Sequence, residues 1–201
     1  MEVAANLGKV VRIEDLLPGS AISTVQSLRP RASSQVGRNQ YSGHYGLGEF
    51  PLHSDLAHWG VPPRYFLLRC IEGARDVFTR VLPWTTILPS FDSLVLQRAV
   101  FAGRKRRMGG CSLVRAMSCQ ETGNIFRWDP VFLKPLNEPA KELARLMTDS
   151  KWAKTASEIP LCRPGDTLLI DNWRALHGRS PVPASSTGRV LERVYVSEIA
   201  L

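Results

Sequence analysis

Short apolar runs separated by turn residues dominate the pattern of hydrophobic and polar positions along the chain. Two such runs, at 64–71 and 76–82, are rich in β-branched, aromatic and leucine side chains, which favours buried strands. Further strands are expected at 111–118, 124–128, 158–162, 167–171 and 189–196. Because strands outnumber helices and do not alternate with them, the pattern predicts a mainly β protein with flanking helices (α+β), a sandwich or barrel.

Two segments show helical periodicity instead. Residues 90–102 are expected to form a helix with Ser90 as its N-cap. Residues 138–153 give the clearest helical pattern, because Pro139 lies near the start and the apolar positions that follow share one face. Loop composition, rich in Arg, Ser, Gly and Gln, covers 29–48.

Composition and charge narrow the class of protein. The 201 residues fit a single domain, expected over 1–201, and carry 26 Lys+Arg against 18 Asp+Glu, for a net charge of +8. Such a balance raises nucleic acid, an anionic membrane or a small anion as partners. With neither a signal peptide nor an apolar stretch of about 18 residues, we expect a cytoplasmic protein without membrane contact. The four cysteines show no CxxC spacing, which favours reduced thiols over a zinc site.

Only four histidines are available for metal or acid–base chemistry. His53 and Asp55 are two positions apart, so on an extended strand both side chains project to the same face and can converge on a metal ion. His177, which follows the strand expected at 167–171, is the natural third ligand. Two histidines and one carboxylate form the facial triad of non-haem Fe(II) oxygenases.

Two arginines follow on the last expected strand. Arg189 and Arg193 are four positions apart and therefore face the same way. A buried guanidinium needs an anion and pairs well with a carboxylate. An Fe(II) enzyme that chelates 2-oxoglutarate needs such a cation for the distal carboxylate of that molecule.

The motifs HSD at 53–55, NWRALHGR at 172–179 and RVLER at 189–193 resemble those of a known enzyme family. It is the taurine dioxygenase and clavaminate synthase-like group of Fe(II)/2-oxoglutarate-dependent oxygenases. The resemblance extends over roughly residues 47–196. It implies a double-stranded β-helix, a jelly-roll barrel, with its core at 49–196.

By position, the resemblance implies that His53, Asp55 and His177 are the catalytic iron ligands. Arg189 corresponds to the arginine that binds the distal carboxylate of 2-oxoglutarate. Arg193 falls where some members use a second arginine near an anionic substrate.

The family also binds 2-oxoglutarate through a threonine, which we assign to Thr79. The usual Gly-Gly-x-Thr is replaced here by Gly-Ala-Arg-Asp, so Asp76 remains an alternative for this position. Candidate substrate residues are His58, three positions after Asp55, and Trp128, on an expected strand. For His58 a structural role is the alternative.

The resemblance implies an enzyme that uses Fe(II), 2-oxoglutarate and O2, releases succinate and CO2, and hydroxylates a small, anionic or amino-acid-like substrate. The alternatives are a non-catalytic jelly-roll binding protein and a nucleic-acid-binding protein that uses the basic cluster at 104–107. That cluster follows an expected helix without interleaved aromatic residues, which favours a solvated loop. Since members of the group usually run longer, we expect a reduced lid at about 30–48 and an active site that a second copy, in a homo-oligomer, could complete.

Overall fold

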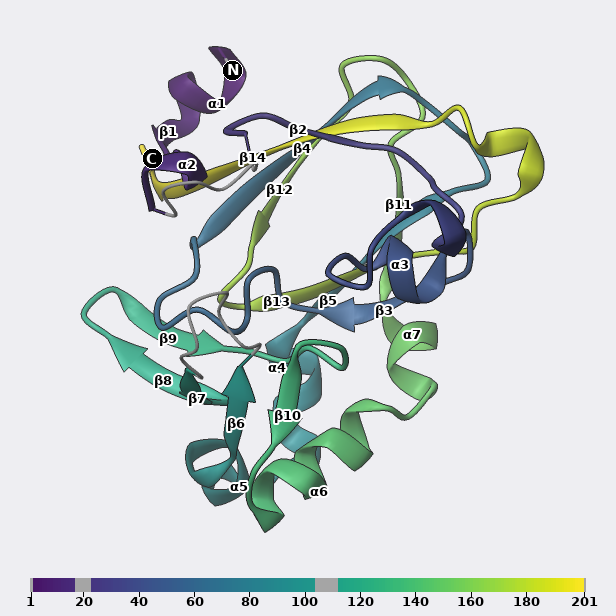
Figure 1. The fold of residues 1–201 in the computed structure, drawn as a ribbon. Coiled ribbons are helices and arrows are strands. Elements are labelled where there is room, and N and C mark those ends of the chain that lie inside the picture. Colours follow the sequence, from purple (N-terminus) through teal and green to yellow (C-terminus); the bar gives the residue numbers. More distant parts are fainter. Residues whose placement is uncertain (1, 17–22, 104–111, 201) are drawn as a thin grey trace.

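A computed structural model describes residues 2–16, 23–103 and 112–200 of the chain, and strands form most of its regular structure (Figure 1). The strands lie in four separate sheets, none of which closes on itself within the described ranges. The chain is therefore mainly β with helices, as the sequence predicts. The basic cluster at 104–107 lies outside the described residues.

The largest sheet has the strand order β1–β14–β4–β12, and β2 also pairs with β14. Every neighbouring pair is antiparallel. Its strands are β1 (Gly8–Val10), β2 (Gln26–Leu28), β4 (Tyr65–Glu72), β12 (Thr167–Asp171) and β14 (Val190–Ile199).

The second sheet, ordered β11–β5–β13–β3, carries the two histidines of the expected triad. Its strands are β3 (Phe50–His53), β5 (Phe78–Pro83), β11 (Ser157–Pro160) and β13 (Ala175–Arg179). The register of β3 on β13 places His53 opposite His177. Next to this pair, the chains approach so closely that a Cβ on Gly178 would lie 2.6 Å from the carbonyl oxygen of Phe50. Glycine is thus needed where the two motifs meet.

These two sheets face each other across an apolar core. The ring of Phe66, on β4, lies 4.7 Å from the ring of His177, on β13. The buried side chains between the sheets include Leu68, Cys70 and Tyr195. Along β4 and β14 the alternate positions are buried as well, in a small cluster on the opposite face that includes Leu67 and Val194.

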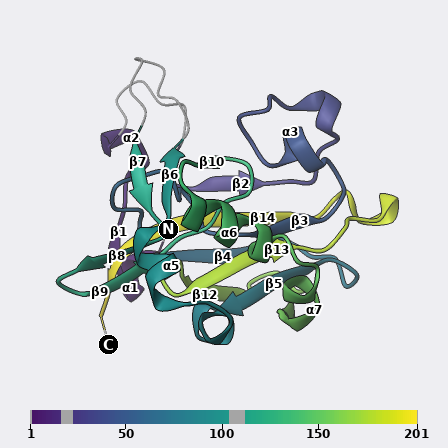
Figure 2. The ribbon, with the colours of Figure 1, turned by 90° about the horizontal axis from the view of Figure 1, so that it is seen from below.

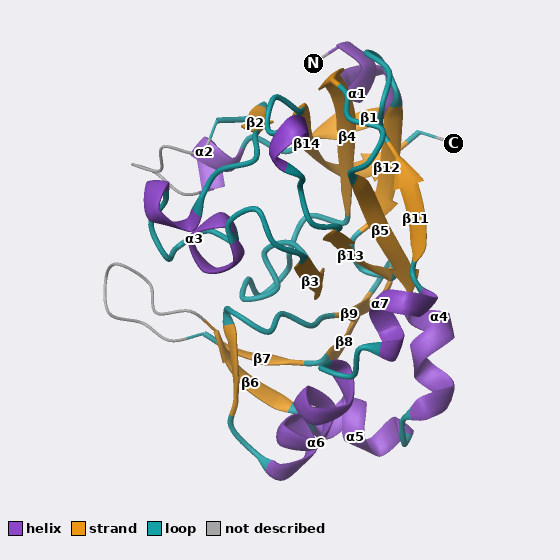
Figure 3. Ribbon diagram, turned by 90° about the vertical axis from the view of Figure 1, so that its right-hand side faces the viewer, coloured by secondary structure: helices purple, strands orange, loops and turns teal. Residues whose placement is uncertain are grey.

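The other half of the molecule packs a helical layer on two small sheets around a second core, rich in Trp and Leu (Figure 3). Its strands are β6 (Val100–Gly103), β7 (Leu113–Arg115), β8 (Met117–Gln120), β9 (Gly123–Phe126) and β10 (Leu133–Pro135). Its helices are α4 (Trp84–Ile87), α5 (Ser93–Arg98), α6 (Glu138–Met147) and α7 (Lys151–Thr155).

Three further short α-helices are α1 (Glu2–Leu7), α2 (Ile13–Leu16) and α3 (Ser42–Tyr45). Short 3-10 helices lie at Ser33–Gln35, Leu88–Ser90 and Ala184–Ser186. Figure 2 shows α3 and its flanking loop outside the strands, next to β3. This loop falls within the segment 29–48 that the composition marks as irregular. Among the described helices, none is long and apolar enough to span a membrane.

The expected strands at 64–71, 76–82, 167–171 and 189–196 are confirmed to within a few residues. The long helix expected at 90–102 is wrong in its second half. Helix α5 covers only six residues and is capped by Asp92, whose side chain accepts the N–H of Leu94, and not by Ser90. From Val100 the chain pairs with β7 and β10 instead, because this buries Phe101 in the second core.

Two further boundaries differ from the expectation. The helix expected at 138–153 is two helices, because the chain breaks after Met147 and Asp149 accepts the N–H of Lys151 at the start of α7. The strand expected at 111–118 is divided at Ala116, whose N–H and carbonyl bond to Ala99 and Arg127.

Candidate metal centre

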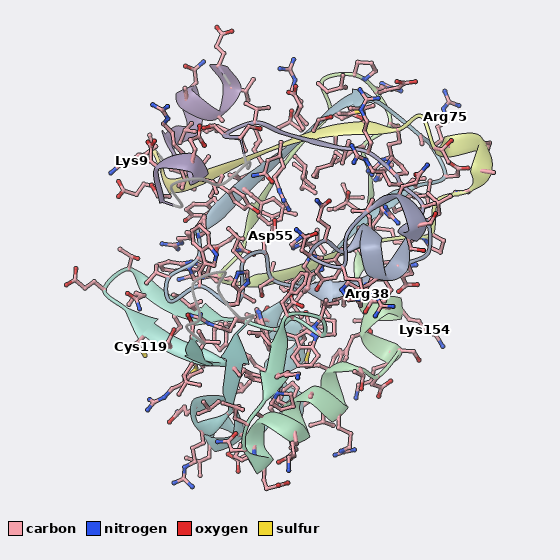
Figure 4. The ribbon with its side chains drawn as sticks, in the orientation of Figure 1. Lys9, Arg38, Asp55, Arg75, Cys119 and Lys154 are labelled. Carbon is pink, nitrogen blue, oxygen red and sulfur yellow. The ribbon has the colours of Figure 1, made fainter. Side chains whose placement is uncertain are left out.

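Three buried side chains bring one ligand atom each to a common point. The candidate ligand atoms of His53, Asp55 and His177 all lie within 4.8 Å of one another. The Nε2 atoms of His53 and His177 lie 3.8 Å and 3.6 Å from Asp55 Oδ1. Figure 4 shows Asp55 in the interior of the molecule, whereas Lys9, Arg75 and Lys154 extend from its periphery.

The ring of His53 is fixed from two sides. Its Nδ1 lies 2.8 Å from the carbonyl oxygen of Pro51, so Nδ1–H donates there and Nε2 is the ring nitrogen that faces Asp55. The ring of Tyr41 stacks on it, with centroids 3.9 Å apart and 20° between the planes. The carbonyl of Pro51 and the ring of Tyr41 together hold His53 with Nε2 available as a metal ligand.

His177 is held in its neutral form. Burial and the neighbouring His53 lower the pKa of His177 to about 3, although the Asp55 carboxylate acts in the opposite direction. At neutral pH the ring is therefore uncharged, which is the state that binds metal ions. Its Nδ1 is buried and has no hydrogen-bond partner among the described residues.

Asp55 presents one carboxylate oxygen to the histidines and has the other occupied. Oδ2 accepts hydrogen bonds from Arg193 Nη1 at 2.5 Å and from the hydroxyl of Tyr195 at 3.0 Å. Burial would raise the pKa of Asp55, but Arg193 and the two histidines outweigh it and lower the pKa to about 2. The carboxylate is thus ionised, with Oδ1 turned toward the two imidazoles.

This donor set fits a divalent iron. Two imidazole nitrogens and one carboxylate oxygen are the ligands of the facial triad, which leaves further coordination positions open. His53, Asp55 and His177, selected from the sequence, are confirmed as neighbours in space.

Arg189 and Thr79 also come together. The Nη2 of Arg189 lies 3.5 Å from Thr79 Oγ1, and both residues are buried. Burial lowers the pKa of Arg189, and its Nε has no hydrogen-bond partner in the described part of the chain. Asp76, the alternative to Thr79, is bonded instead to the hydroxyl of Ser186 in an exposed position. The position of Thr79 beside a buried cation favours Thr79 over Asp76 for an anionic ligand.

The predicted substrate residues occupy different surroundings. Arg193 lies at the triad itself, bonded to Asp55 and, through Nη2, to Gln26 Oε1 at 2.7 Å. His58 is half-buried, with its ring edge-on to Phe132. Trp128 packs in the second core against Phe101, while its backbone bonds to Ser54. A substrate contact for each of these residues stays a prediction.

Sequence reasoning overlooked three residues at this site. Tyr195 lies two positions after Arg193 on β14, so the alternation of a strand could have indicated it. Gln26 and Tyr41 belong to distant segments whose only sequence signal is loop or strand-like composition. Asp129 adjoins Trp128, in a segment where the family resemblance already suggests substrate contacts; it is buried and interacts electrostatically with Tyr41 and His53.

The chain has measurable similarity to known oxygenases, although no protein-family model matches it. It is 23% identical over 189 residues to an L-lysine 3-hydroxylase from Catenulispora acidiphila, across 86% of this chain and 51% of that protein. The chain thus spans about half the length of this curated relative.

Solved structures of oxygenases are similar to this chain in their fold. The asparagine oxygenase AsnO superposes with a TM-score of 0.73 and 21% identity, over 97% of this chain and 61% of that one. The non-heme iron oxygenase OrfP in complex with Fe, succinate and (3S)-hydroxy-L-Arg gives a TM-score of 0.69 at 21% identity, over 97% of this chain and 64% of that one. The chain therefore shares the fold of iron- and 2-oxoglutarate-dependent amino acid oxygenases, as the resemblance implies.

Proposed function

We propose that residues 1–201 form one domain of a non-haem Fe(II)- and 2-oxoglutarate-dependent oxygenase that hydroxylates an amino acid. The observation that carries this proposal is the convergence of His53 Nε2, His177 Nε2 and Asp55 Oδ1 in a buried position. The two larger sheets, which face each other around this point, correspond in the proposal to the double-stranded β-helix, with 30–48 as its lid.

Each side chain has a defined task in the proposed reaction. His53, Asp55 and His177 hold the iron, while Arg189 and Thr79 bind the distal carboxylate of 2-oxoglutarate. When bound, iron and 2-oxoglutarate supply the oxidising chemistry, in which O2 is consumed, succinate and CO2 are released and one oxygen atom enters the substrate. The surrounding protein positions the groups and excludes water.

The substrate is proposed to be an amino acid because the site offers groups for both of its ends. Arg193 Nε and Gln26 Nε2 are buried donors without hydrogen-bond partners among the described residues, and they suit an α-carboxylate. Asp129 is a buried carboxylate whose pKa is raised by burial. The groups acting on it in the described structure include neither a lysine nor an arginine, so it suits a cationic substrate side chain.

The names of the similar proteins, or the molecules bound to them, also point to amino acids as substrates. Lysine, asparagine and arginine are named with the L-lysine 3-hydroxylase, the asparagine oxygenase and OrfP. Since Asp129 pairs best with a positive charge, we propose that lysine or arginine is preferred to asparagine.

The test is turnover of 2-oxoglutarate by the purified protein with Fe(II), ascorbate and a panel of free amino acids. We expect succinate formation coupled to a product heavier by one oxygen atom, with lysine or arginine best. His177→Ala and Asp55→Asn should abolish both, whereas Glu142→Gln, which alters an exposed carboxylate on α6, should not. Equal turnover by the wild type and His177→Ala would refute the proposal.

A further inference from the structure

The backbone of Asp55 is held on both sides by one buried side chain, Asn172. Asn172 Oδ1 accepts the N–H of Asp55 at 2.8 Å, and its Nδ2 donates to the carbonyl oxygens of Asp55 and Pro63, each at 3.0 Å. The side chain has no exposed surface. All of its polar groups are therefore used to connect the end of β12 to the turn that contains Asp55.

This turn contains a strained residue directly after the candidate metal ligand. Leu56 has φ +54°, and in the described part of the chain it is the one non-glycine residue with a positive φ. A side chain disfavours this left-handed conformation, which persists only where the surroundings impose it. The peptide group joining Asp55 to Leu56 has its carbonyl oxygen bonded to Asn172 Nδ2. That bond therefore opposes rotation of this peptide group toward an ordinary φ.

Side chain and backbone of Asp55 are thus fixed by different partners. Arg193 and Tyr195 hold carboxylate Oδ2, but they cannot prevent movement of the main chain beneath it. Rotation of the peptide between Asp55 and Leu56 would change the direction of the Asp55 side chain. Oδ1 would then leave the point that it shares with the two imidazoles.

We propose that Asn172 is a positioning residue for the metal centre. It holds Leu56 in the left-handed conformation and thereby fixes the direction in which Asp55 presents Oδ1. This inference rests on the metal site of the proposed function.

The neighbouring Trp173 provides a matched control. Its Nε1 donates to the carbonyl oxygen of Pro62 at 2.9 Å, and its side chain is also buried. Trp173→Phe, like Asn172→Ala, removes a buried hydrogen bond to the 62–63 loop. Only Asn172→Ala also releases the backbone of Asp55, so the pair separates loss of stability from loss of ligand position.

The experiment is an anaerobic titration of the metal-free protein with Co(II), followed by its visible absorption, together with thermal unfolding of each variant. We expect Asn172→Ala to weaken Co(II) binding by about 10- to 100-fold, the usual effect of removing a partner that orients a metal ligand. Trp173→Phe should lower the unfolding temperature but leave the Co(II) affinity close to that of the wild type.

A second substitution tests the role of the turn. Glycine adopts a positive φ without a steric penalty, so Leu56→Gly in the Asn172→Ala background should recover most of the lost Co(II) affinity. In the wild-type background Leu56→Gly should leave this affinity unchanged. Failure of the double variant to recover affinity would overturn the proposal that Asn172 acts through Leu56.

The remaining outcomes are equally decisive. Equal Co(II) affinities for Asn172→Ala and Trp173→Phe would overturn the positioning role, with the metal site intact. If Asn172→Ala does not fold, Asn172→Asp replaces it, because it keeps the acceptor for the Asp55 N–H but loses both donors. Lack of Co(II) binding by the wild type, or undiminished binding by His177→Ala, would overturn the proposed metal site and this inference with it.

Discussion

Two buried carboxylates lie near His53, and their surroundings shift their pKa values in opposite directions. Asp55 has the Arg193 guanidinium on one oxygen, which outweighs burial and lowers its pKa. Asp129 has no such partner in the described structure, and burial raises its pKa even though His53 and two backbone N–H groups oppose the shift. One residue is thus a permanent anion, while the other carries an incompletely compensated charge.

Asp129→Asn should therefore stabilise the protein at neutral pH. Because burial holds the native pKa of Asp129 above its ordinary value of 3.8, the native state binds more protons than the unfolded state between these two values. Stability consequently falls as pH rises through this window and stays reduced above it. Asparagine keeps the acceptor for the N–H groups of Val131 and Phe132, so we expect a gain in stability at pH 7 and none below the unfolded pKa.

Urea unfolding of the metal-free protein at several pH values measures this effect. Asp149→Asn is the matched control, because Asp149 Oδ1 also accepts the N–H two positions ahead, in an exposed place. Asp149→Asn should change the free energy of unfolding little at any of these pH values. If Asp129→Asn instead destabilised the protein at pH 7, the charge of Asp129 would be well compensated in the native state.

At the residue scale, the sequence was informative where the chemistry imposes a spacing. His53 and Asp55 could be found because a histidine and a carboxylate two positions apart can converge on a metal ion, although Asp55 lies in the turn after β3 and not on the expected strand. His177 could be found because few histidines exist. The contact between Asn172 and Asp55 could not be found from spacing. It depends on how the end of β12 is placed relative to the turn that contains Asp55, which is a tertiary property.

Among the elements, α6 is joined through its N-cap residue Asn137 to the sheet that contains β6. The side chain of Asn137 accepts the N–H of Ala140 and that of Val100, each at 3.1 Å, and donates to the carbonyl oxygen of Arg98 at 2.7 Å. One side chain thus caps α6 and also binds the chain where α5 passes into β6. Its loss affects both the helix end and the start of the strand.

Asn137→Ala should lower the free energy of unfolding by about 2 kcal/mol, because it removes a cap and leaves partly buried backbone N–H groups of Val100 and Ala140 without this partner. Ser150→Ala is the control, since Ser150 occupies the N-cap of α7 without a side-chain hydrogen bond to that helix. Chemical denaturation of both variants provides the comparison. Similar losses for the two would mean that the bonds of Asn137 contribute little.

Helix α5 shows why the helix expected at 90–102 was only partly correct. The helical pattern of this segment is real over Ser93–Arg98, but the next residues, Val100 and Phe101, suit a strand equally well. Pairing with β7 and with β10, which is more distant in sequence, decides in favour of the strand. Local propensity was therefore sufficient for strands that are mostly apolar, such as β4, and insufficient where helix and strand compete.

On the scale of the whole molecule, the candidate site joins the two larger sheets. The sheet containing β3 and β13 contributes His53 and His177, and the sheet containing β14 contributes Arg193 and Tyr195. Arg189, immediately before β14, reaches Thr79 on β5. A metal ion and 2-oxoglutarate bound at these residues would therefore link both sheets, and would bind only when the sheets are correctly placed.

Binding should accordingly raise the unfolding temperature of the whole chain. A ligand present at about 100 times its Kd stabilises the native state by about 2.7 kcal/mol. For a chain of this size, each kcal/mol corresponds to a rise of about 2–4 °C, so saturating Co(II) should raise the temperature by about 5–10 °C. Adding 2-oxoglutarate to the Co(II)-bound protein should give a second increase of similar size.

Variants of Arg189 and His177 separate the rise in unfolding temperature caused by Co(II) from the rise caused by 2-oxoglutarate. Arg189→Gln should retain the increase caused by Co(II) but lose that caused by 2-oxoglutarate, because its guanidinium holds the second ligand and not the first. His177→Ala should lose both, since 2-oxoglutarate is proposed to bind through the metal. Arg163→Gln, which alters an exposed arginine in a turn, should lose neither. A 2-oxoglutarate increment that survives in Arg189→Gln would place the distal carboxylate elsewhere, and one that survives in His177→Ala would show that the molecule binds independently of the metal.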